Sequence, residues 1–171
     1  MIAAVDAHYA ETQAIAACVV FHRWTDHRPC GEIIERIPNA APYEPGRFYL
    51  RELPCLLAVL DKVSRPLEAI LIDGYVWLGD EAKPGLGAHL YASLGKITPV
   101  IGVAKSRFHQ GKAVQALLRG KSSRPLFVSA AGVELAEAAA HVREMHGPFR
   151  VPTLLKHVDR LCRGISLAAR S

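Results

Sequence analysis

The sequence predicts an α/β protein in which a mixed β-sheet, an antiparallel meander joined to parallel strands, is flanked by helices. Two apolar runs rich in β-forming residues, 2–9 and 14–21, are typical of a hairpin. Two shorter, continuous apolar runs, 69–72 and 99–104, are typical of strands that are buried on both faces. Segments with helical periodicity lie between and after these runs, so helices are expected to cover the sheet.

The first half of the chain supplies the meander, a loop and a helix. A strand over 32–37 follows the predicted hairpin. Three prolines make 37–46 an irregular loop. Beyond it, aliphatic side chains recur at the i, i+3, i+4, i+7 spacing of a buried helical face, and Pro54 leaves the start of this helix open. These side chains are Leu53, Leu56, Leu57, Leu60 and Val63.

The second half of the chain alternates strands with helices. Helices are predicted over 86–94, 113–118, 134–145 and 153–162, and a further strand over 126–129. A meander followed by this alternation indicates a mixed sheet with helices on its faces.

The composition is that of an ordinary globular protein. Of the 171 residues, 50% are apolar and 22% charged, which is enough for one well-buried core, and 1–171 is expected to be a single domain. The 13 glycines and 11 prolines exclude a collagen-like or proline-rich chain. A net charge of +5 and a pI of about 9.2 make a polyanion a reasonable partner, although many basic enzymes bind no nucleic acid.

The cysteines and the N-terminus indicate the compartment. The four cysteines form no C-x-x-C pair, which argues against a zinc ribbon. No basic segment precedes an apolar stretch at the N-terminus, and no apolar run approaches the ~20 residues needed to span a bilayer. We expect a reduced, cytoplasmic protein without membrane contact.

Carboxylates interrupt two of the apolar strands. Asp73 directly follows the run 69–72 and is expected at the carboxyl end of a buried strand, where ligands of open α/β sheets collect. An unpaired buried carboxylate is costly, so Asp73 needs a metal, a cation or backbone donors, or else it caps the next turn. Asp6 lies inside the first strand, where β-propensity disfavours aspartate, and this favours a functional role unless the strand is a solvated edge.

Two further charged residues extend this pattern. Lys105 ends the run 99–104 as Asp73 ends its own strand, so its ammonium is expected either to pair with Asp73 or to bind a phosphate. Glu52 is expected at the margin of the apolar face of the first helix. Two acids on strands and one on a helix are what a two-metal phosphodiesterase needs, because carboxylates are hard oxygen ligands that suit Mg²⁺.

The motifs of several other enzyme classes are absent. Gly120-Lys-Ser122 is similar to the end of a P-loop, but Gln115 stands where its first glycine is required. The sequence contains no H-E-x-x-H, G-x-S-x-G or G-x-G-x-x-G. A phosphodiesterase centre therefore has no strong competitor among these motifs.

Several motifs, taken in order and covering nearly the whole chain, resemble the endonuclease V family. The most specific are the block ending in Lys105 and Ser106 and the Tyr-x-Pro-Gly loop. The motifs are Asp6-Ala-His-Tyr9, Ala14-Ile-Ala-Ala-Cys-Val-Val20, Tyr43-Glu-Pro-Gly46, Arg51-Glu52 with Pro54, Leu71-Ile-Asp-Gly74, Gly85-Leu-Gly-Ala-His-Leu90, Ile101-Gly-Val-Ala-Lys-Ser106 and Pro125-Leu-Phe-Val-Ser129.

The resemblance implies a ribonuclease H-like fold and a DNA-repair type of activity. That activity is Mg²⁺-dependent hydrolysis, with Mn²⁺ as a possible substitute, of a phosphodiester bond 3′ to hypoxanthine (inosine) in DNA or RNA. Asp6, Glu52 and Asp73 would form the acidic metal-binding centre, and Lys105 would stabilise the phosphate and the attacking water. His157 would complete the metal site, with Asp159 as its rival.

The resemblance also implies where the nucleic acid binds. Tyr43, Pro45 and Gly46 would form a wedge loop that opens the duplex and leaves the lesion base in a pocket, unless Tyr43 is simply a packed loop aromatic. Gly74 would line that pocket, because a residue without a side chain lets a base approach the backbone. Ser106 would lie beside the nucleic acid.

The chain departs from the family pattern in several places. The first strand is expected within a few residues of Met1, so we expect the helical segment that usually precedes it in the family, and with it some nucleic-acid or packing surface, to be absent. Glu44 places a negative charge in the wedge loop, where it would face phosphate. Two histidines expected after Asp73 are absent, and Tyr75 and Trp77 in that stretch would either stack on a base or fill core. The metal centre is thus expected to be intact and the base pocket altered.

Two alternatives stay open at this point. One is a ribonuclease H-like nuclease without inosine specificity, and the other is a non-catalytic nucleic-acid-binding relative that keeps the fold. Retention of the three acids and Lys105 argues against the second, because unused buried charges only cost stability. We expect a monomer. Basic side chains of the second half would form either a phosphate-binding surface or, as is commoner for such residues, a solvated face. These are Arg107, Lys112, Arg119, Lys121 and Arg124.

Overall fold

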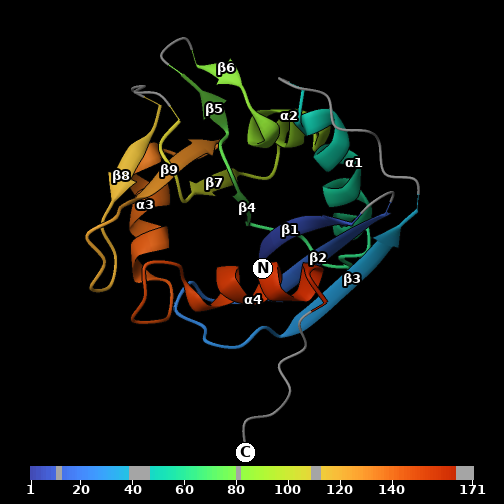
Figure 1. Ribbon diagram of the computed structural model, residues 1–171, viewed down its shortest axis with the longest axis horizontal. Helices are drawn as coiled ribbons and strands as arrows, with labels where there is room; N and C mark the ends of the chain where they lie inside the picture. The colour runs from blue at the N-terminus through green and yellow to red at the C-terminus, as the bar shows by residue number, and fades with distance from the viewer. Residues whose placement is uncertain (11–12, 39–46, 80–81, 109–112, 165–171) are drawn as a thin grey trace, which may run out of the picture.

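The predicted mixed sheet is present and has seven strands. In the computed structural model, which describes residues 1–10, 13–38, 47–79, 82–108 and 113–164, the strand order is β3-β2-β1-β4-β7-β9-β8 (Figure 1). The three central strands β1, β4 and β7 are parallel, and the outer strands are antiparallel to their neighbours. The strands are β1 (Ile2–Ala10), β2 (Gln13–Phe21), β3 (Gly31–Ile37), β4 (Ala69–Asp73), β7 (Val100–Ala104), β8 (Gln115–Leu117) and β9 (Leu126–Ala131), and a separate hairpin joins β5 (Trp77–Leu78) to β6 (Lys83–Pro84).

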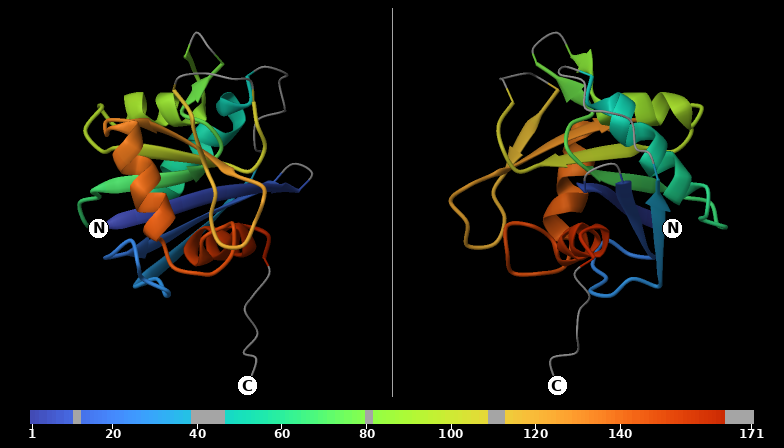
Figure 2. Two further views of the ribbon diagram at one scale, coloured as in Figure 1. Left: turned by 90° about the vertical axis from the view of Figure 1, so that its left-hand side faces the viewer. Right: turned by 45° about the vertical axis from the view of Figure 1, so that its right-hand side comes forward.

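Four helices cover the two faces of the sheet. The helices α1 (Tyr49–Leu60) and α2 (Leu86–Ser93) pack on one face, and α3 (Leu135–Glu144) and α4 (Thr153–Cys162) pack on the other. Figures 1 and 2 show this three-layer arrangement, with α4 running beneath β1 and β2. Within the described part of the chain, none of the helices is long and apolar enough to cross a membrane.

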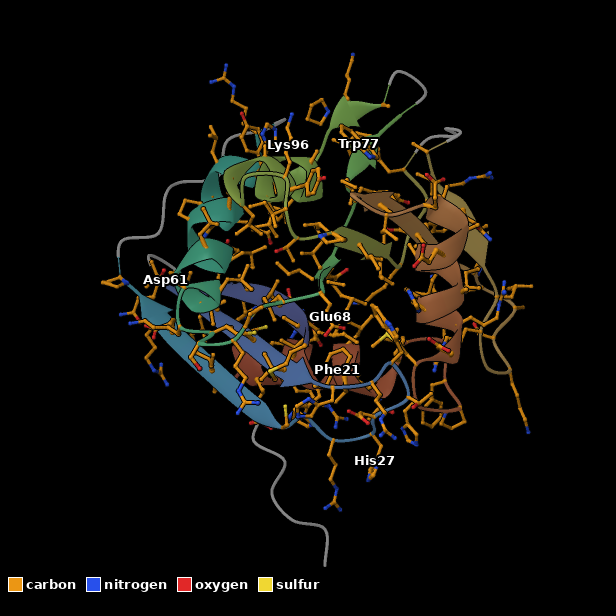
Figure 3. The ribbon with its side chains drawn as sticks, turned by 180° about the vertical axis from the view of Figure 1, so that it is seen from behind. Phe21, His27, Asp61, Glu68, Trp77 and Lys96 are labelled. Atoms are coloured by element: carbon orange, nitrogen blue, oxygen red, sulfur yellow. The ribbon has the colours of Figure 1, made fainter. Side chains whose placement is uncertain are left out.

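Alternation of side chains along β1 divides the interior into two cores. Ala3 and Val5 belong to the core under α1 and α2, whereas Ile2 and Ala4 belong to the core under α3 and α4. Phe21, seen from behind in Figure 3, is fully buried in this second core. The same alternation turns Asp6 toward the α4 side of the sheet.

The register of the central strands brings the charged residues of the sequence together. Val5 pairs with Ile72, so Asp6 follows on β1 at the level where Asp73 ends β4. Asp73 in turn pairs with Val103, two residues before Lys105. Because the three strands are parallel, all three charged side chains emerge at one edge of the sheet, the carboxyl edge.

The sequence prediction of the fold class is confirmed, and one element is wrong. The segment 113–118 was expected to be a short helix, but it contains β8, an edge strand paired with β9. Ala116 and Leu117 have good helix propensity, but pairing with β9 and burial of Leu117 outweigh it. The β5–β6 hairpin is an addition that the apolar pattern did not indicate.

The burial of β8 leads to a prediction on stability. Leu117 is 1% exposed and the adjacent Leu118 is 62% exposed. Leu117→Ala should therefore lower the free energy of unfolding by about 2–5 kcal/mol, and Leu118→Ala by less than about 0.5 kcal/mol. Urea denaturation of the two variants measures both values. Equal losses in the two variants would contradict the strand assignment, since they would mean that Leu117 is no more buried than Leu118.

Candidate metal centre

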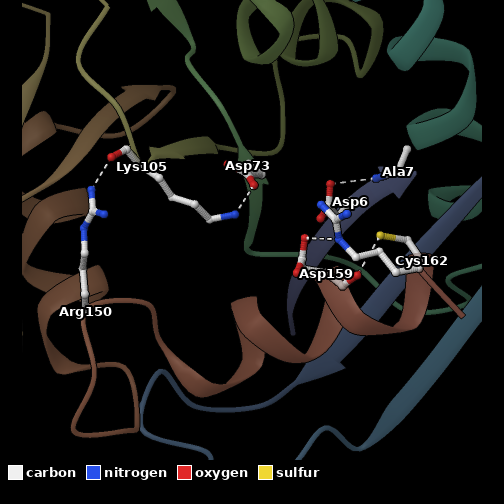
Figure 4. Close-up of polar contacts among 8 residues, drawn as sticks. Asp6, Ala7, Asp73, Lys105, Arg150, Asp159 and Cys162 are labelled. Atoms are coloured by element: carbon white, nitrogen blue, oxygen red, sulfur yellow. Dashed lines mark hydrogen bonds and ion pairs between the residues drawn. The ribbon is translucent and has the colours of Figure 1, made fainter. Parts of the chain in front are cut away.

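Three aspartates from three elements converge at the carboxyl edge of the sheet. Asp6 comes from β1, Asp73 ends β4, and Asp159 comes from α4, which packs across this part of the sheet. One carboxylate oxygen of each lies within 4.8 Å of those of the other two. Figure 4 shows Asp6 and Asp159 facing one another beside Asp73. Clustered carboxylate oxygens are the donor set that a hard divalent cation prefers.

The surroundings of Asp6 leave its charge poorly compensated. The backbone N–H of Ala7 donates to Oδ1 of Asp6 at 2.8 Å. Burial, followed by the negative charge of Asp73, nevertheless raises the pKa of Asp6 to about 6. The native structure therefore holds a carboxylate where ionisation is unfavourable without a nearby cation.

Glu52 brings a fourth carboxylate close to the same charges from the opposite helical layer. It lies in the first turns of α1 and is 8% exposed. Burial, with the charges of Asp6 and Asp73, raises the pKa of Glu52 to about 8. Its Oε2 is buried and accepts no hydrogen bond from the described residues. Glu52 is not one of the three carboxylates that lie within 4.8 Å of one another, but a buried oxygen without a hydrogen bond, near enough to feel the charges of Asp6 and Asp73, fits a cation ligand better than a structural role.

Lys105 supplies the positive charge at the mouth of the centre. Its Nζ donates to Oδ2 of Asp73 at 2.6 Å, and both side chains are partly exposed. Burial lowers the pKa of Lys105, but the hydrogen bond and charge of Asp73 outweigh this effect and raise it above its ordinary value. Lys105 is thus a permanent cation that solvent, or a phosphate, can reach.

The backbone around Lys105 is fastened from two sides. Arg150 donates through Nη2 to the carbonyl of Lys105 and, at 2.7 Å, to that of Pro125 (Figure 4). The hydroxyl of Tyr75 donates to the carbonyl of Ser106 at 2.8 Å and accepts from the backbone N–H of Phe108 at 3.2 Å. Neither Arg150 nor Tyr75 was predicted to support the centre, since neither contact is local in sequence.

The structure brings Asp159 to the centre and does not bring His157. Nε2 of His157 lies 2.7 Å from Oε1 of Glu32 on β3, away from the three aspartates. Successive helical residues are about 100° apart, so residues 157 and 159 point in nearly opposite directions from α4. Arg163, one turn further along, donates through Nε to Oδ1 of Asp159 at 3.0 Å. The rival that the sequence offered is therefore the residue that completes the carboxylate group.

The residues expected to contact the nucleic acid differ in where the structure places them. Gly74 has φ +130°, and a Cβ there would meet no atom within 4 Å, so open space lies beside its backbone. Ser106 is exposed next to Lys105. The wedge-loop residues Tyr43, Pro45 and Gly46 lie outside the described residues. Trp77 donates through Nε1 to the carbonyl of Ala130 at 2.8 Å and packs against the core, so it does not stack on a base in this structure.

The basic side chains expected to bind phosphate do not all reach the surface. Arg119 is 6% exposed, and its guanidinium donates to the backbone carbonyls of Met145 and Phe149. Its assignment to the phosphate-binding surface is therefore corrected: it is a buried structural residue. Lys121, Arg107 and Arg124 are exposed, and Lys112 lies outside the described residues.

Comparison with known sequences identifies one family. The sequence profile of the family described as Endonuclease V matches residues 1–122. A protein named Endonuclease V from Streptomyces avermitilis is 34% identical over 71% of this chain, and the matched part spans 61% of the length of that relative. An Endonuclease V from Geotalea uraniireducens is 31% identical over 96% of this chain and 77% of its own length.

Comparison with solved structures identifies the same fold. The crystal structure of the Streptomyces avermitilis Endonuclease V superposes with a TM-score of 0.75 at 29% identity, covering 95% of this chain and 79% of the other. Endonuclease V of Ciona intestinalis, in complex with a DNA that contains an inosine, superposes with a TM-score of 0.80 at 20% identity, covering 95% and 84%. These neighbours have a ribonuclease H-like fold, which confirms the predicted fold class.

The geometry predicts that a divalent cation stabilises the protein through Asp159 and not through His157. At a concentration of Mg²⁺ or Mn²⁺ about 100-fold above its dissociation constant, the wild type should gain about 2.7 kcal/mol over the protein in EDTA. Asp159→Asn should lose most of this gain, because a ligand is removed, and His157→Gln should keep it. Urea denaturation with and without metal measures the three gains.

The same measurements contain their own control. In EDTA, Asp159→Asn should be no less stable than the wild type, because it removes repulsion among the carboxylates. A metal effect that disappears in His157→Gln and persists in Asp159→Asn would restore His157 as the ligand.

Proposed function

The chain belongs to the endonuclease V family, and on this basis we propose that it is a divalent-metal-dependent endonuclease that cuts 3′ to hypoxanthine in DNA or RNA. The observation that carries the proposal is the convergence of three aspartate oxygens within 4.8 Å of one another, beside the ammonium of Lys105. Hydrolysis of a phosphodiester needs charge stabilisation on both sides of the phosphorus, and this edge of the sheet offers the groups for it.

The carboxylates form the metal-binding part of the site. Asp6, Asp73 and Asp159 would hold the cation, with Glu52 as a further ligand from α1. We propose Mg²⁺, with Mn²⁺ as a substitute, since the donors are all oxygens and include neither sulfur nor imidazole. When bound, the cation supplies Lewis-acid charge that polarises the phosphate and favours attack by water.

Lys105 has a separate task at the phosphate. Its ammonium is tied to Asp73 and partly exposed, so a scissile phosphate that approaches the carboxylates comes within its reach. There the ammonium would donate to a phosphate oxygen on which negative charge develops during attack. The contacts of Arg150 and Tyr75 keep the Lys105 backbone in place, so only the side chain of Lys105 would have to move from Asp73 to the phosphate.

The base would enter beside Gly74. A side chain at this position would fill the open space next to the backbone and would strain a residue with φ +130°. Ser106 directly follows Lys105, just beyond the end of β7. It therefore lies at the same edge of the sheet as Gly74, which follows the neighbouring strand β4. The Ciona relative was solved with an inosine-containing DNA, which supports inosine as the base recognised here.

Electrostatics favour catalysis over simple nucleic-acid binding. Three aspartates gathered at one edge, with Glu52 on α1 near them, repel a polyanion unless a cation neutralises them. Glu52 is buried and Asp6 is half-buried, and burial raises the pKa values of both carboxyl groups. A protein that only bound nucleic acid would gain nothing from this arrangement.

The proposal predicts cleavage that depends on metal and on inosine. End-labelled DNA and RNA, single- and double-stranded, each with and without one inosine, are incubated with Mg²⁺ or EDTA. The wild type should cut 3′ to inosine in Mg²⁺ alone. Lys105→Ala should lower kcat by about 10²–10³-fold, because one positive group at the developing charge is lost. The remote Lys62→Ala should leave kcat unchanged.

Asp73→Asn serves as the control for contaminating nucleases and should abolish the cut. Metal-dependent cleavage that ignores inosine would support the nuclease without lesion specificity. A protein that binds the strands in Mg²⁺ but cuts none of them would contradict the proposed activity and support the non-catalytic binding protein.

A further inference from the structure

A groove leads away from the metal centre along α4. Its volume is about 700 Å³, and it shares Lys105 and Asp159 with the centre. Four of the five charged residues that line it are basic, and Asp159 is the exception. The basic residues are Lys105, Lys121, Arg150 and Lys156. Such a lining suits an anion that extends beyond the carboxylates.

The wall of the groove presents an aromatic ring on a fixed backbone. Phe149 is 66% exposed, which is unusual for so large an apolar side chain. Its backbone carbonyl accepts from the buried guanidinium of Arg119, which also binds the carbonyl of Met145. Gly120 packs against the same segment so closely that a Cβ would clash with the carbonyl of Pro148. The backbone that carries the exposed ring is therefore held in place by buried contacts.

Cations accompany this ring. The ammonium of Lys156 lies 5.6 Å from the centroid of the Phe149 ring, and Lys121 lines the same groove. Both lysine side chains are exposed. Arg150, in contrast, is engaged by the carbonyls of Lys105 and Pro125 and shapes the floor. An aromatic platform accompanied by exposed ammonium groups is how proteins hold single-stranded nucleic acid.

We propose that the groove binds the strand that continues from the scissile phosphate, with one base stacked on Phe149 and neighbouring phosphates at Lys121 and Lys156. This inference rests on the proposed function, because continuity with the metal centre is what selects a nucleic-acid strand as the occupant. The groove would fix the direction in which the cut strand leaves the centre, and it would add affinity that does not depend on the lesion base.

Stacking is tested directly with a fluorescent purine analogue whose emission falls when it stacks. The analogue is placed at successive positions on either side of one inosine in a single-stranded DNA, and binding is followed in EDTA, which prevents cleavage and leaves the repulsion by the carboxylates equal in every variant compared. The wild type should quench it at one position. Phe149→Leu, which keeps an apolar side chain, should lose that quenching and bind about tenfold more weakly.

The phosphate contacts are tested by the salt dependence of the same binding. Lys121→Ala with Lys156→Ala should reduce the slope of log affinity against log salt by about 0.7 for each lysine removed. The control, Lys62→Ala with Arg65→Ala, removes two exposed charges beyond the far end of α1 and should affect the slope less.

The outcomes separate this inference from the proposed function. Suppose that the wild type cuts at inosine, but Phe149→Leu quenches as the wild type does and the lysine variant has the salt slope of the control. This result would overturn the proposed role of the groove and leave the proposed nuclease activity standing. Quenching that requires Phe149, in a protein that cuts no substrate, would uphold the groove and overturn the nuclease.

Discussion

Repulsion among closely spaced carboxylates is the constraint around which the carboxyl edge of the sheet is arranged. The parallel register of β1 and β4 fixes Asp6 against Asp73, and α4 adds Asp159 to them. The protein compensates some of this charge, through Lys105 on Asp73 and Arg163 on Asp159. Asp6 and Glu52 form no ion pair with a cation among the described residues, and burial raises their pKa values in spite of the nearby charges of Lys105 and Arg51. The remaining imbalance is what a divalent cation would remove.

Much of the fold follows from patterns that are local in sequence. Continuous apolar runs identified β4 and β7 because a strand buried on both faces needs no alternation. The edge strand β8 was missed, since three residues with helical propensity become a strand only through pairing with β9. The contacts that hold Lys105 were also beyond reach, because Tyr75 and Arg150 lie 30 and 45 residues away from it.

Helix geometry explains why the sequence left the choice between His157 and Asp159 open. The buried stripe of α4 consists of Leu154, Val158 and Cys162. His157 and Asp159 flank this stripe on opposite sides, each about 100° from its centre. The apolar pattern therefore predicts the stripe but not which flank faces β4. The order of the strands determines which flank faces β4. On one side of β1 lie β2 and β3, where His157 contacts Glu32, and on the other side lies β4 with Asp73.

The centre and the groove draw on different parts of the chain. Asp6, Glu52, Asp73 and Lys105 all fall within residues 1–122, which match the family profile, whereas Asp159 and most of the groove come from 148–159. Asp6 and Asp73 lie on paired parallel strands, so their spacing is fixed by the ladder of hydrogen bonds, whereas Glu52 lies on α1 and Lys105 directly follows β7. The second set depends on how the segment before α4 is fastened, and Arg119 does this from inside the protein. The guanidinium of Arg119 thus holds the backbone of Phe149 in place, and the lysines around Phe149 are the groups that would contact a nucleic-acid strand.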